Sequence, residues 1–386
     1  TVRNMGFQRL GENGTGVAIW EQYRPQFPVT RNLTYLNHAA VAPLCGPAAD
    51  AMRGLATDAC EFGSFHYDKW LACYDGFRDA AARLINAKSS EIAITKNTSE
   101  GIATVQMGLN WRTGDVVVAF KEEFPANFFP WKRLEAKGVN VRWLSIYDPL
   151  EAIDKAATGA RLLAISYINY LSGFRVDLNA IGEICQRRGC FYLVDAIQGL
   201  GAFPIDVEAA QIDALAADGH KWLLGPEGCA VLYVRQSRQD EIEPVEFGWT
   251  NIAGYNDYAC RDMALRQDAG RYEPGTLNTI GCYGLEASMK FLLEVGVERI
   301  GPVVQARADQ IAAGATERGY ELMIPRTPSS GAGIVCIRKP DVDSRMTVSQ
   351  LRAKGFTSAP RQGWVRLSPH FCISPEDIGR LLEALA

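Results

Sequence analysis

The segment Ala216-Ala-Asp-Gly-His-Lys-Trp222 indicates how this chain of 386 residues folds. It ends a short apolar run, residues 212–217, that is typical of a buried strand. A second apolar run, residues 191–194, ends directly on Asp195. Because open α/β sheets bind their ligands at the carboxyl ends of the strands, Lys221 and Asp195 are predicted to face one cleft.

The surrounding sequence alternates short apolar strands with helical patterns. The expected strands are residues 91–96, 115–120, 139–144, 161–167, 190–195, 212–217 and 229–235. Two helices broken near Gly63 are expected within residues 47–87, and further helices at 102–109, 130–137 and 178–188. Strands that are apolar throughout and alternate with helices predict an α/β fold with a mostly parallel central sheet covered on both faces.

The pattern changes near Gly281. A helix at 282–295, a further helix, strand-like segments at 333–338 and 364–368, and a last helix at 375–385 predict a smaller α+β domain at the C-terminus. We therefore expect a large domain over residues 17–288 and a small domain over 289–386. Residues 1–30 show no sustained period and are expected to be an irregular lead-in, with residues 1–16 packing near the small domain.

The composition excludes several classes of protein. Apolar residues make up 47% of the chain, charged residues make up 22%, and the net charge of −4 gives no reason to expect nucleic acid as a partner. Apolar runs are too short to span a membrane, and the first residues lack the pattern of a secretion signal. The ten cysteines form no CxxC pair, so we expect free thiols, no metal site and a cytoplasmic location.

Lys221 and Asp195 suggest a particular cofactor. An enclosed lysine loses its proton readily and becomes an amine nucleophile toward carbonyls. A carboxylate opposite it can keep a pyridinium nitrogen protonated, which is the arrangement expected for pyridoxal 5'-phosphate. Gln198 is placed to donate to the phenolic oxygen of the same ring. The alternative is that Asp195 caps the turn that follows it. Gly199 and Gly201 do not form a dinucleotide fingerprint, which disfavours a nicotinamide-dependent oxidoreductase.

The segment Asn97-Thr-Ser-Glu-Gly101 follows one strand and opens a helix. Free backbone N–H groups at a helix N-terminus, beside the hydroxyls of Thr98 and Ser99, suit a phosphate ester. The alternative is an ordinary helix cap. His220 is placed to donate to the same phosphate, and Asp218 to organise the turn or to face His220.

Together these residues resemble the class V aminotransferase family, the fold-type I pyridoxal phosphate enzymes that include cysteine desulfurases, cystine lyases and isopenicillin N epimerase. The segment 218–228 is similar to the family's lysine motif, and Asp195-x-x-Gln198 has the matching spacing. The resemblance implies an internal aldimine at Lys221, with Asp195 on the ring nitrogen and Gln198 on the ring hydroxyl. It also implies that Thr98, Ser99 and His220 bind the phosphate and that Phe124 stacks on the ring.

The resemblance also implies a substrate site and a partner. Arg366 lies where the family grips the substrate α-carboxylate. The same pocket is expected to be lined by Asn37, Asn169, Tyr170 and Arg361. The loop Arg271-Tyr-Glu-Pro-Gly-Thr276 resembles one that reaches the partner's phosphate, which implies a homodimer with shared active sites and a contact by Thr276. The alternative for this loop is a plain turn.

The expected function is that of a pyridoxal phosphate enzyme acting on a small amino acid, aminotransferase-like. A carbon–sulfur lyase and an epimerase stay open, because all three begin with loss of the Cα proton, for which Lys221 is the natural base. A catalytically silent cofactor-binding protein is a further alternative. The desulfurase family's cysteine loop is absent from 354–364, so a persulfide-transferring desulfurase is disfavoured.

Overall fold

A computed structural model describes residues 17–385 and contains the predicted central sheet. All seven predicted strands are confirmed to within two residues at each end. They are β2 (Ile92–Thr95), β3 (Val116–Phe120), β4 (Asn140–Leu144), β5 (Leu162–Ser166), β6 (Phe191–Asp195), β7 (Ala214–Asp218) and β8 (Ala230–Val234).

The strands are arranged in the order β2-β8-β7-β6-β5-β3-β4. Neighbours from β7 to β4 are parallel, and β8 is antiparallel to both β7 and β2. Every strand except β8 therefore ends at the same edge of the sheet. This arrangement brings the residues that follow β2, β6 and β7 to one edge, although they are far apart in the sequence.

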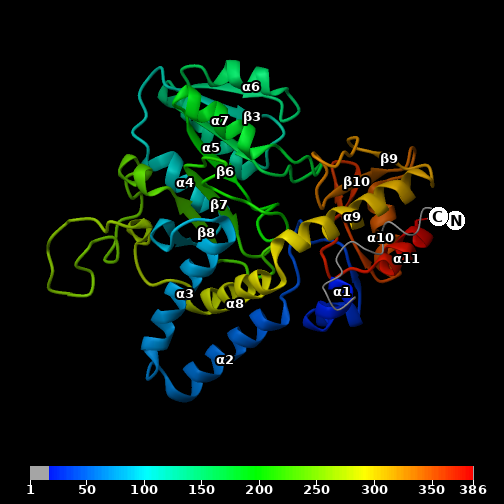
Figure 1. The fold of residues 1–386 in the computed structure, drawn as a ribbon, viewed down its shortest axis with the longest axis horizontal. Coiled ribbons are helices and arrows are strands. Elements are labelled where there is room, and N and C mark those ends of the chain that lie inside the picture. The colour runs from blue at the N-terminus through cyan, green and yellow to red at the C-terminus, as the bar shows by residue number, and fades with distance from the viewer. Residues whose placement is uncertain (1–16, 386) are drawn as a thin grey trace.

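Helices cover both faces of the sheet (Figure 1). Helices α4 and α5 pack on the face formed by one set of alternate strand residues, and α3, α7 and α8 pack on the face formed by the other set. The predicted break near Gly63 is confirmed. The helices are α2 (Gly46–Phe62), α3 (Tyr67–Ile85), α4 (Thr98–Gly108), α5 (Phe129–Leu134), α6 (Leu150–Ala157), α7 (Leu178–Arg188) and α8 (Thr279–Val295). Short 3-10 helices span Ser89–Glu91, Pro125–Asn127, Glu135–Lys137, Gln236–Glu241 and Ala269–Tyr272.

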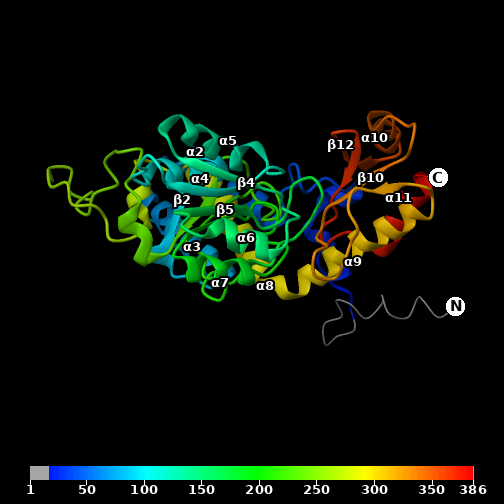
Figure 2. The ribbon, with the colours of Figure 1, turned by 90° about the horizontal axis from the view of Figure 1, so that it is seen from above.

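The part of the chain after α8 forms a separate α+β layer beside the sheet, as Figures 1 and 2 show. Its antiparallel sheet has the order β12-β13-β10-β9. Its elements are α9 (Val297–Thr316), β9 (Glu321–Leu322), β10 (Val335–Arg338), α10 (Ser344–Ala353), β12 (Ala359–Arg361), β13 (Trp364–Leu367) and α11 (Pro375–Ala384). A two-stranded pair, β1 (Thr34–Tyr35) with β11 (Phe356–Thr357), ties this part to the N-terminal segment. The division after residue 288 stays a prediction, and it falls inside α8.

The N-terminal segment is more ordered than the sequence predicted. The expectation of an irregular lead-in is wrong for residues 19–31, which form α1 (Ile19–Tyr23) and two 3-10 turns, Arg24–Gln26 and Pro28–Arg31. Tertiary contacts hold them: the Tyr23 ring lies 5.7 Å from that of Phe291, and Arg24 pairs with Asp377 at 2.6 Å. These partners are remote in sequence, so local periodicity carried no signal. The expected packing of residues 1–16 lies outside the described residues. Within residues 17–385, the helices are all too short or too polar to cross a bilayer.

Candidate active site

A cavity of about 390 Å³ opens at the edge of the sheet where the parallel strands end. It collects residues from the ends of β2, β6 and β7, from the loop after β3, and from the β12–β13 hairpin. Eleven residues predicted from the sequence line it: Thr98, Ser99, Phe124, Tyr170, Asp195, Gln198, Asp218, His220, Lys221, Arg361 and Arg366. The fold therefore assembles one site from segments that are as much as 327 residues apart, from Ala39 to Arg366.

Lys221 lies just beyond β7, and its side chain is buried. Burial lowers the pKa of its amine from 10.5 to about 8, because the desolvated cation is disfavoured, and the Asp195 carboxylate only partly offsets this effect. The Phe124 ring covers the amine, with its centroid 5.6 Å from Nζ. Near neutral pH an appreciable fraction of the amine is unprotonated and able to attack a carbonyl.

Asp195 ends β6 and is 3% exposed. Burial raises the pKa of its carboxyl to about 6, while the backbone N–H of Ile197 and the Lys221 cation favour the ionised form. The Ile197 N–H donates to Oδ1 at 3.0 Å. The turn-capping alternative is thus present, but it occupies only one carboxylate oxygen. The other oxygen remains available to a ring nitrogen in the cavity.

Gln198 is held in one orientation by two hydrogen bonds. Its Oε1 accepts from Trp222 Nε1 at 2.8 Å, and its Nε2 donates to the Ala39 carbonyl at 3.1 Å. An amide nitrogen carries two hydrogens. One hydrogen is therefore left to donate into the cavity, which suits the predicted contact with a ring oxygen.

The opposite end of the cavity lies at the start of α4, where the sequence predicts a phosphate site. The helix begins at Thr98, four residues before the predicted start, and Asn97 caps it by accepting from the Glu100 N–H at 2.9 Å. The hydroxyls of Thr98 and Ser99 are therefore not needed as caps. Thr98 Oγ1 accepts from the Asp218 N–H at 2.9 Å and keeps its own hydrogen for a ligand. Free N–H groups at this terminus favour a phosphate.

His220 belongs to the same end of the cavity. Its Nδ1 lies 2.9 Å from Asp218 Oδ1. Asp218 therefore faces His220, as one of the two predicted arrangements had it, although neither of these two atoms has a hydrogen-bond partner among the described residues. This contact also removes the difficulty of a lone acid close to a phosphate.

Arg366, Tyr170 and Phe124 line the part of the cavity where the sequence predicts the substrate. Arg366 is 2% exposed and donates to the Tyr170 carbonyl at 2.7 Å, while its Nε has no acceptor. The Tyr170 and Phe124 rings meet edge to face, with centroids 5.2 Å apart. A buried guanidinium with an unsatisfied donor fits a carboxylate ligand.

Three predicted site residues lie outside this lining. The prediction that Asn169 lines the pocket is wrong, because its buried amide organises its own loop. The amide donates to the Glu122 carbonyl and accepts from the N–H groups of Leu171 and Ser172. Asn37 pairs through its backbone with Ser368 and does not line the cavity. Thr276 is exposed and lines a separate hollow, so its contact with a partner's phosphate stays a prediction.

Sequence reasoning did not identify Glu123, a buried carboxyl behind Asp195. Glu123 accepts a hydrogen bond from the Ser166 N–H at 2.6 Å and shares a second with the Ser166 hydroxyl. Burial, reinforced by the Asp195 charge, raises the pKa of Glu123 to about 8. The sequence does contain a signal for this residue, because Glu123 closely follows the strand that ends at Phe120, just as Asp195 ends its own strand.

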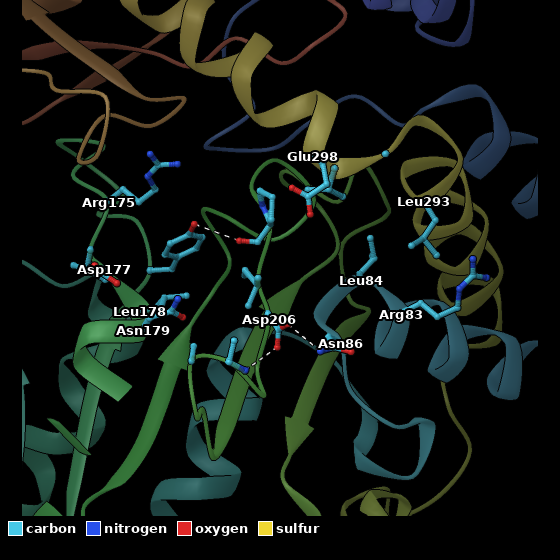
Figure 3. Close-up of a pocket in the computed structure, with 18 residues that line it drawn as sticks. Arg83, Leu84, Asn86, Arg175, Asp177, Leu178, Asn179, Asp206, Leu293 and Glu298 are labelled. Atoms are coloured by element: carbon cyan, nitrogen blue, oxygen red, sulfur yellow. Dashed lines mark hydrogen bonds between the residues drawn. The ribbon is translucent and has the colours of Figure 1, made fainter. Parts of the chain in front are cut away.

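A second cavity, about 520 Å³ in volume, lies where α3, the loop after β5 and the α8–α9 junction meet (Figure 3). Its charged groups are largely engaged with the protein itself. Asp206 accepts from Asn86 at 2.9 Å, and Arg175 donates to the Pro328 carbonyl at 2.9 Å. Neither a lysine nor a cysteine is among the described residues of its wall. The smaller cavity is therefore the one equipped for covalent chemistry.

Known proteins agree with this geometry. The family model described as "Aminotransferase class-V" matches residues 34–358. The chain belongs to the class-V aminotransferase family. A probable cysteine desulfurase of Methanothermobacter thermautotrophicus is 35% identical over 289 residues, 72% of each chain. An uncharacterized aminotransferase of Bacillus subtilis, YcbU, is 29% identical and covers 95% of this chain and 97% of its own.

Solved structures share this fold. The apo cysteine desulfurase from Thermococcus onnurineus superposes with a TM-score of 0.86 at 26% identity, over 94% of this chain and 96% of its own. The cystine C–S lyase C-DES superposes with a TM-score of 0.86 at 24% identity, over 93% and 99%. At that identity the second likeness concerns the fold alone.

As a class-V protein, this chain is a pyridoxal phosphate-dependent enzyme, a transferase or a lyase. The cavity fits the cofactor: an enclosed amine, a carboxylate opposite it, and a helix N-terminus with free hydroxyls at the far end. Lys221 would hold it covalently, Asp195 its ring nitrogen, and Thr98, Ser99 and His220 its phosphate. When bound, the cofactor supplies an electron sink for charge that develops at the substrate Cα. Among residues 17–385, His, Cys, Asp and Glu side chains form no group suited to a metal ion.

Proposed function

We propose that the enzyme transfers the amino group of a small amino acid whose α-carboxylate is bound by Arg366. Lys221 would be the base that takes the proton from the substrate Cα, and the cofactor, when bound, would supply the electron sink for the charge left on that carbon. The supporting geometry is the buried, unpaired guanidinium in the same cavity as an amine of lowered pKa. Burial strengthens the attraction between the guanidinium and a carboxylate, and it excludes water from the proton transfer.

The observation that carries this proposal is the chemistry of the lining. Among the described residues that line the cavity, none is a cysteine. Cys336 lies behind the lining, its Sγ donates to the Leu171 carbonyl at 2.9 Å, and burial raises the pKa of its thiol to about 12. A thiol of that pKa is not a sulfur nucleophile at neutral pH. Persulfide transfer by a protein cysteine is therefore disfavoured, and Lys221 remains as the group that moves protons.

A carbon–sulfur lyase is the second candidate. Two relatives are named probable cysteine desulfurases, and these names support a sulfur-containing substrate for this enzyme. A β-elimination needs the same lysine base and carboxylate clamp and no protein thiol. An epimerase would use the same Cα proton loss, with return of the proton to the other face. Phe124 covers the Lys221 amine and carries no acid or base, which weakens that route.

The test is product analysis on the purified, cofactor-loaded enzyme. Keto-acid formation from an amino acid that requires an added keto-acid acceptor supports transamination. Pyruvate and sulfide released from cysteine or cystine without an acceptor would instead establish the lyase. Full cofactor occupancy with no turnover of any amino acid would contradict both and favour a silent cofactor-binding protein. Lys221→Ala is the matched control, because it removes the proposed base in every case.

We also propose that the enzyme is a homodimer with shared active sites. The loop between residues 243 and 268 extends away from the body of the molecule as the yellow-green segment of Figures 1 and 2. It exposes large apolar side chains, with Trp249 47% and Tyr258 79% accessible. Thr276 is exposed in a neighbouring hollow. A second copy covering these side chains would place Thr276 of one copy beside the phosphate site of the other. Comparing the sedimentation of Trp249→Glu with that of wild type tests whether the chain dimerises through this loop.

A cytoplasmic location belongs to the same proposal. All ten cysteines lie in the described part of the chain, and each is a free thiol. Free, mostly buried thiols are typical of a reducing compartment. Fractionation of cells that express a tagged chain would test this location.

A further inference from the structure

A tight hairpin brings two arginines to the substrate end of the cavity. Strands β12 and β13 pair antiparallel, with Arg361 opposite Trp364 and Ala359 opposite Arg366. The two linking residues, Gln362 and Gly363, have φ of +49° and +82°, as a two-residue hairpin turn with positive φ at both positions requires. This turn fixes the register of the pair.

The register determines the direction of both side chains. Residues directly opposite share a face of the ladder, and so do alternate residues along one strand. Arg361 and Arg366 are therefore diagonal neighbours on one face, a separation of about 7–8 Å that long side chains bridge. Both line the cavity that holds Lys221.

The positive charge of this pair is not balanced by the protein. In residues 17–385, Arg361 and Arg366 form no ion pair with an acid. Arg366 donates to the Tyr170 carbonyl and leaves its buried Nε without an acceptor, and Arg361 donates to its own neighbour's carbonyl at Pro360. Burial, together with the Arg361 charge, lowers the pKa of Arg366 to about 10. Lys221 adds a third cation nearby.

The acids of the cavity lie elsewhere. Asp218 faces His220 at the phosphate end, and Asp195 ends β6 beneath the ring site. One substrate α-carboxylate satisfies the fork of one guanidinium. A neutral amino acid would therefore leave the second guanidinium unpaired in a partly desolvated site.

We propose that Arg361 and Arg366 together select amino acids that carry a second acidic group, a carboxylate or a sulfinate, on the side chain. This inference rests on the proposed amino-acid substrate and deepens it. Arg366 binds the α-carboxylate, and Arg361, half-buried at the end of its strand, binds the acidic group of the side chain. The Tyr170 hydroxyl, which accepts from Gln362 Nε2 at 3.0 Å, holds the hairpin against this end of the cavity.

The test is the dissociation constant of a panel of amino acids, measured from the absorbance of the bound cofactor in the dimeric, loaded enzyme. The panel is aspartate, glutamate and cysteine sulfinate against alanine and serine. Wild type is expected to bind the acidic set at least about tenfold more tightly, the size of one charge-assisted hydrogen bond. Arg361→Gln is expected to remove that preference, and Arg361→Lys to restore part of it.

Two further measurements complete the test. Arg345→Gln, at an exposed arginine outside the cavity, is the matched control and should keep the preference. Stabilisation of the loaded enzyme by succinate, compared with propionate, reports the same two-anion site without chemistry. If Arg361→Gln weakens the binding of acidic and neutral amino acids equally, the subsite is overturned and the proposed function still stands. No response of the cofactor to any amino acid would overturn both.

Discussion

Burial of the Lys221 cation makes this residue costly to the cofactor-free protein, and replacing it with methionine should stabilise that form. The pKa of the amine falls from 10.5 in the unfolded chain to about 8 in the folded one. At about 1.4 kcal/mol for each pKa unit, the folded state loses about 3 kcal/mol when the amine is charged in both states. Lys221→Met can gain at most this much unfolding free energy at pH 7. In the variant the Asp195 carboxylate loses the cation that favours its ionised form, which offsets part of the gain.

The pH dependence gives the sign of the effect. Well below pH 8 the amine is mostly protonated in both states, and nearly the whole penalty is present. Between pH 8 and 10.5 the folded protein releases the proton while the unfolded chain keeps it, so wild-type stability rises with pH. The gap between Lys221→Met and wild type should therefore fall from about 3 kcal/mol at pH 7 to under about 1 kcal/mol at pH 10.

Urea unfolding of the cofactor-free proteins across this pH range is the assay. Lys137→Met, at an exposed lysine, is the control and should show no such trend. A stability difference that stays constant from pH 7 to pH 10, or a variant less stable than wild type at pH 7, would refute the reasoning.

Four further expectations follow from the site. Covalent uptake of pyridoxal phosphate by the cofactor-free enzyme should accelerate with pH toward a midpoint near 8, because only the neutral Lys221 amine attacks; a midpoint near 10.5 in stopped-flow absorbance would contradict this. Asp195→Asn should lower kcat/KM by about tenfold or more, since it removes a charge-assisted hydrogen bond to the ring; unchanged kinetics would remove Asp195 from the ring site. Glu123→Gln keeps both hydrogen bonds to Ser166, so its free energy of unfolding should be close to that of wild type. Glu123→Ala leaves the Ser166 N–H unsatisfied and should lower the free energy of unfolding by about 1–3 kcal/mol. Equal decreases for both variants in urea unfolding would mean that the ionised carboxylate stabilises the fold. Arg366→Lys should raise the KM of amino acids at least about tenfold, because an ammonium cannot replace the planar fork; an unchanged KM would place the α-carboxylate elsewhere.

The sequence by itself was enough for the sheet and for the centre of the site. Strands such as 191–195 are apolar throughout and bounded by turns, so their pattern is local and survives without tertiary information. The residues that end those strands follow from the same pattern, because parallel strands deliver their last side chains to one edge. Lys221, Asp195 and Thr98 were therefore predictable together, and the cavity contains all three.

The remaining features could not be predicted, because they depend on contacts between distant segments. Residues 19–31 are ordered by Phe291 and Asp377, which no local period reports. Glu123 became notable only when the fold buried it behind Asp195. The two arginines of the β12–β13 hairpin share a face because a turn sets their register, and they meet Lys221 only because the C-terminal layer packs against the sheet edge.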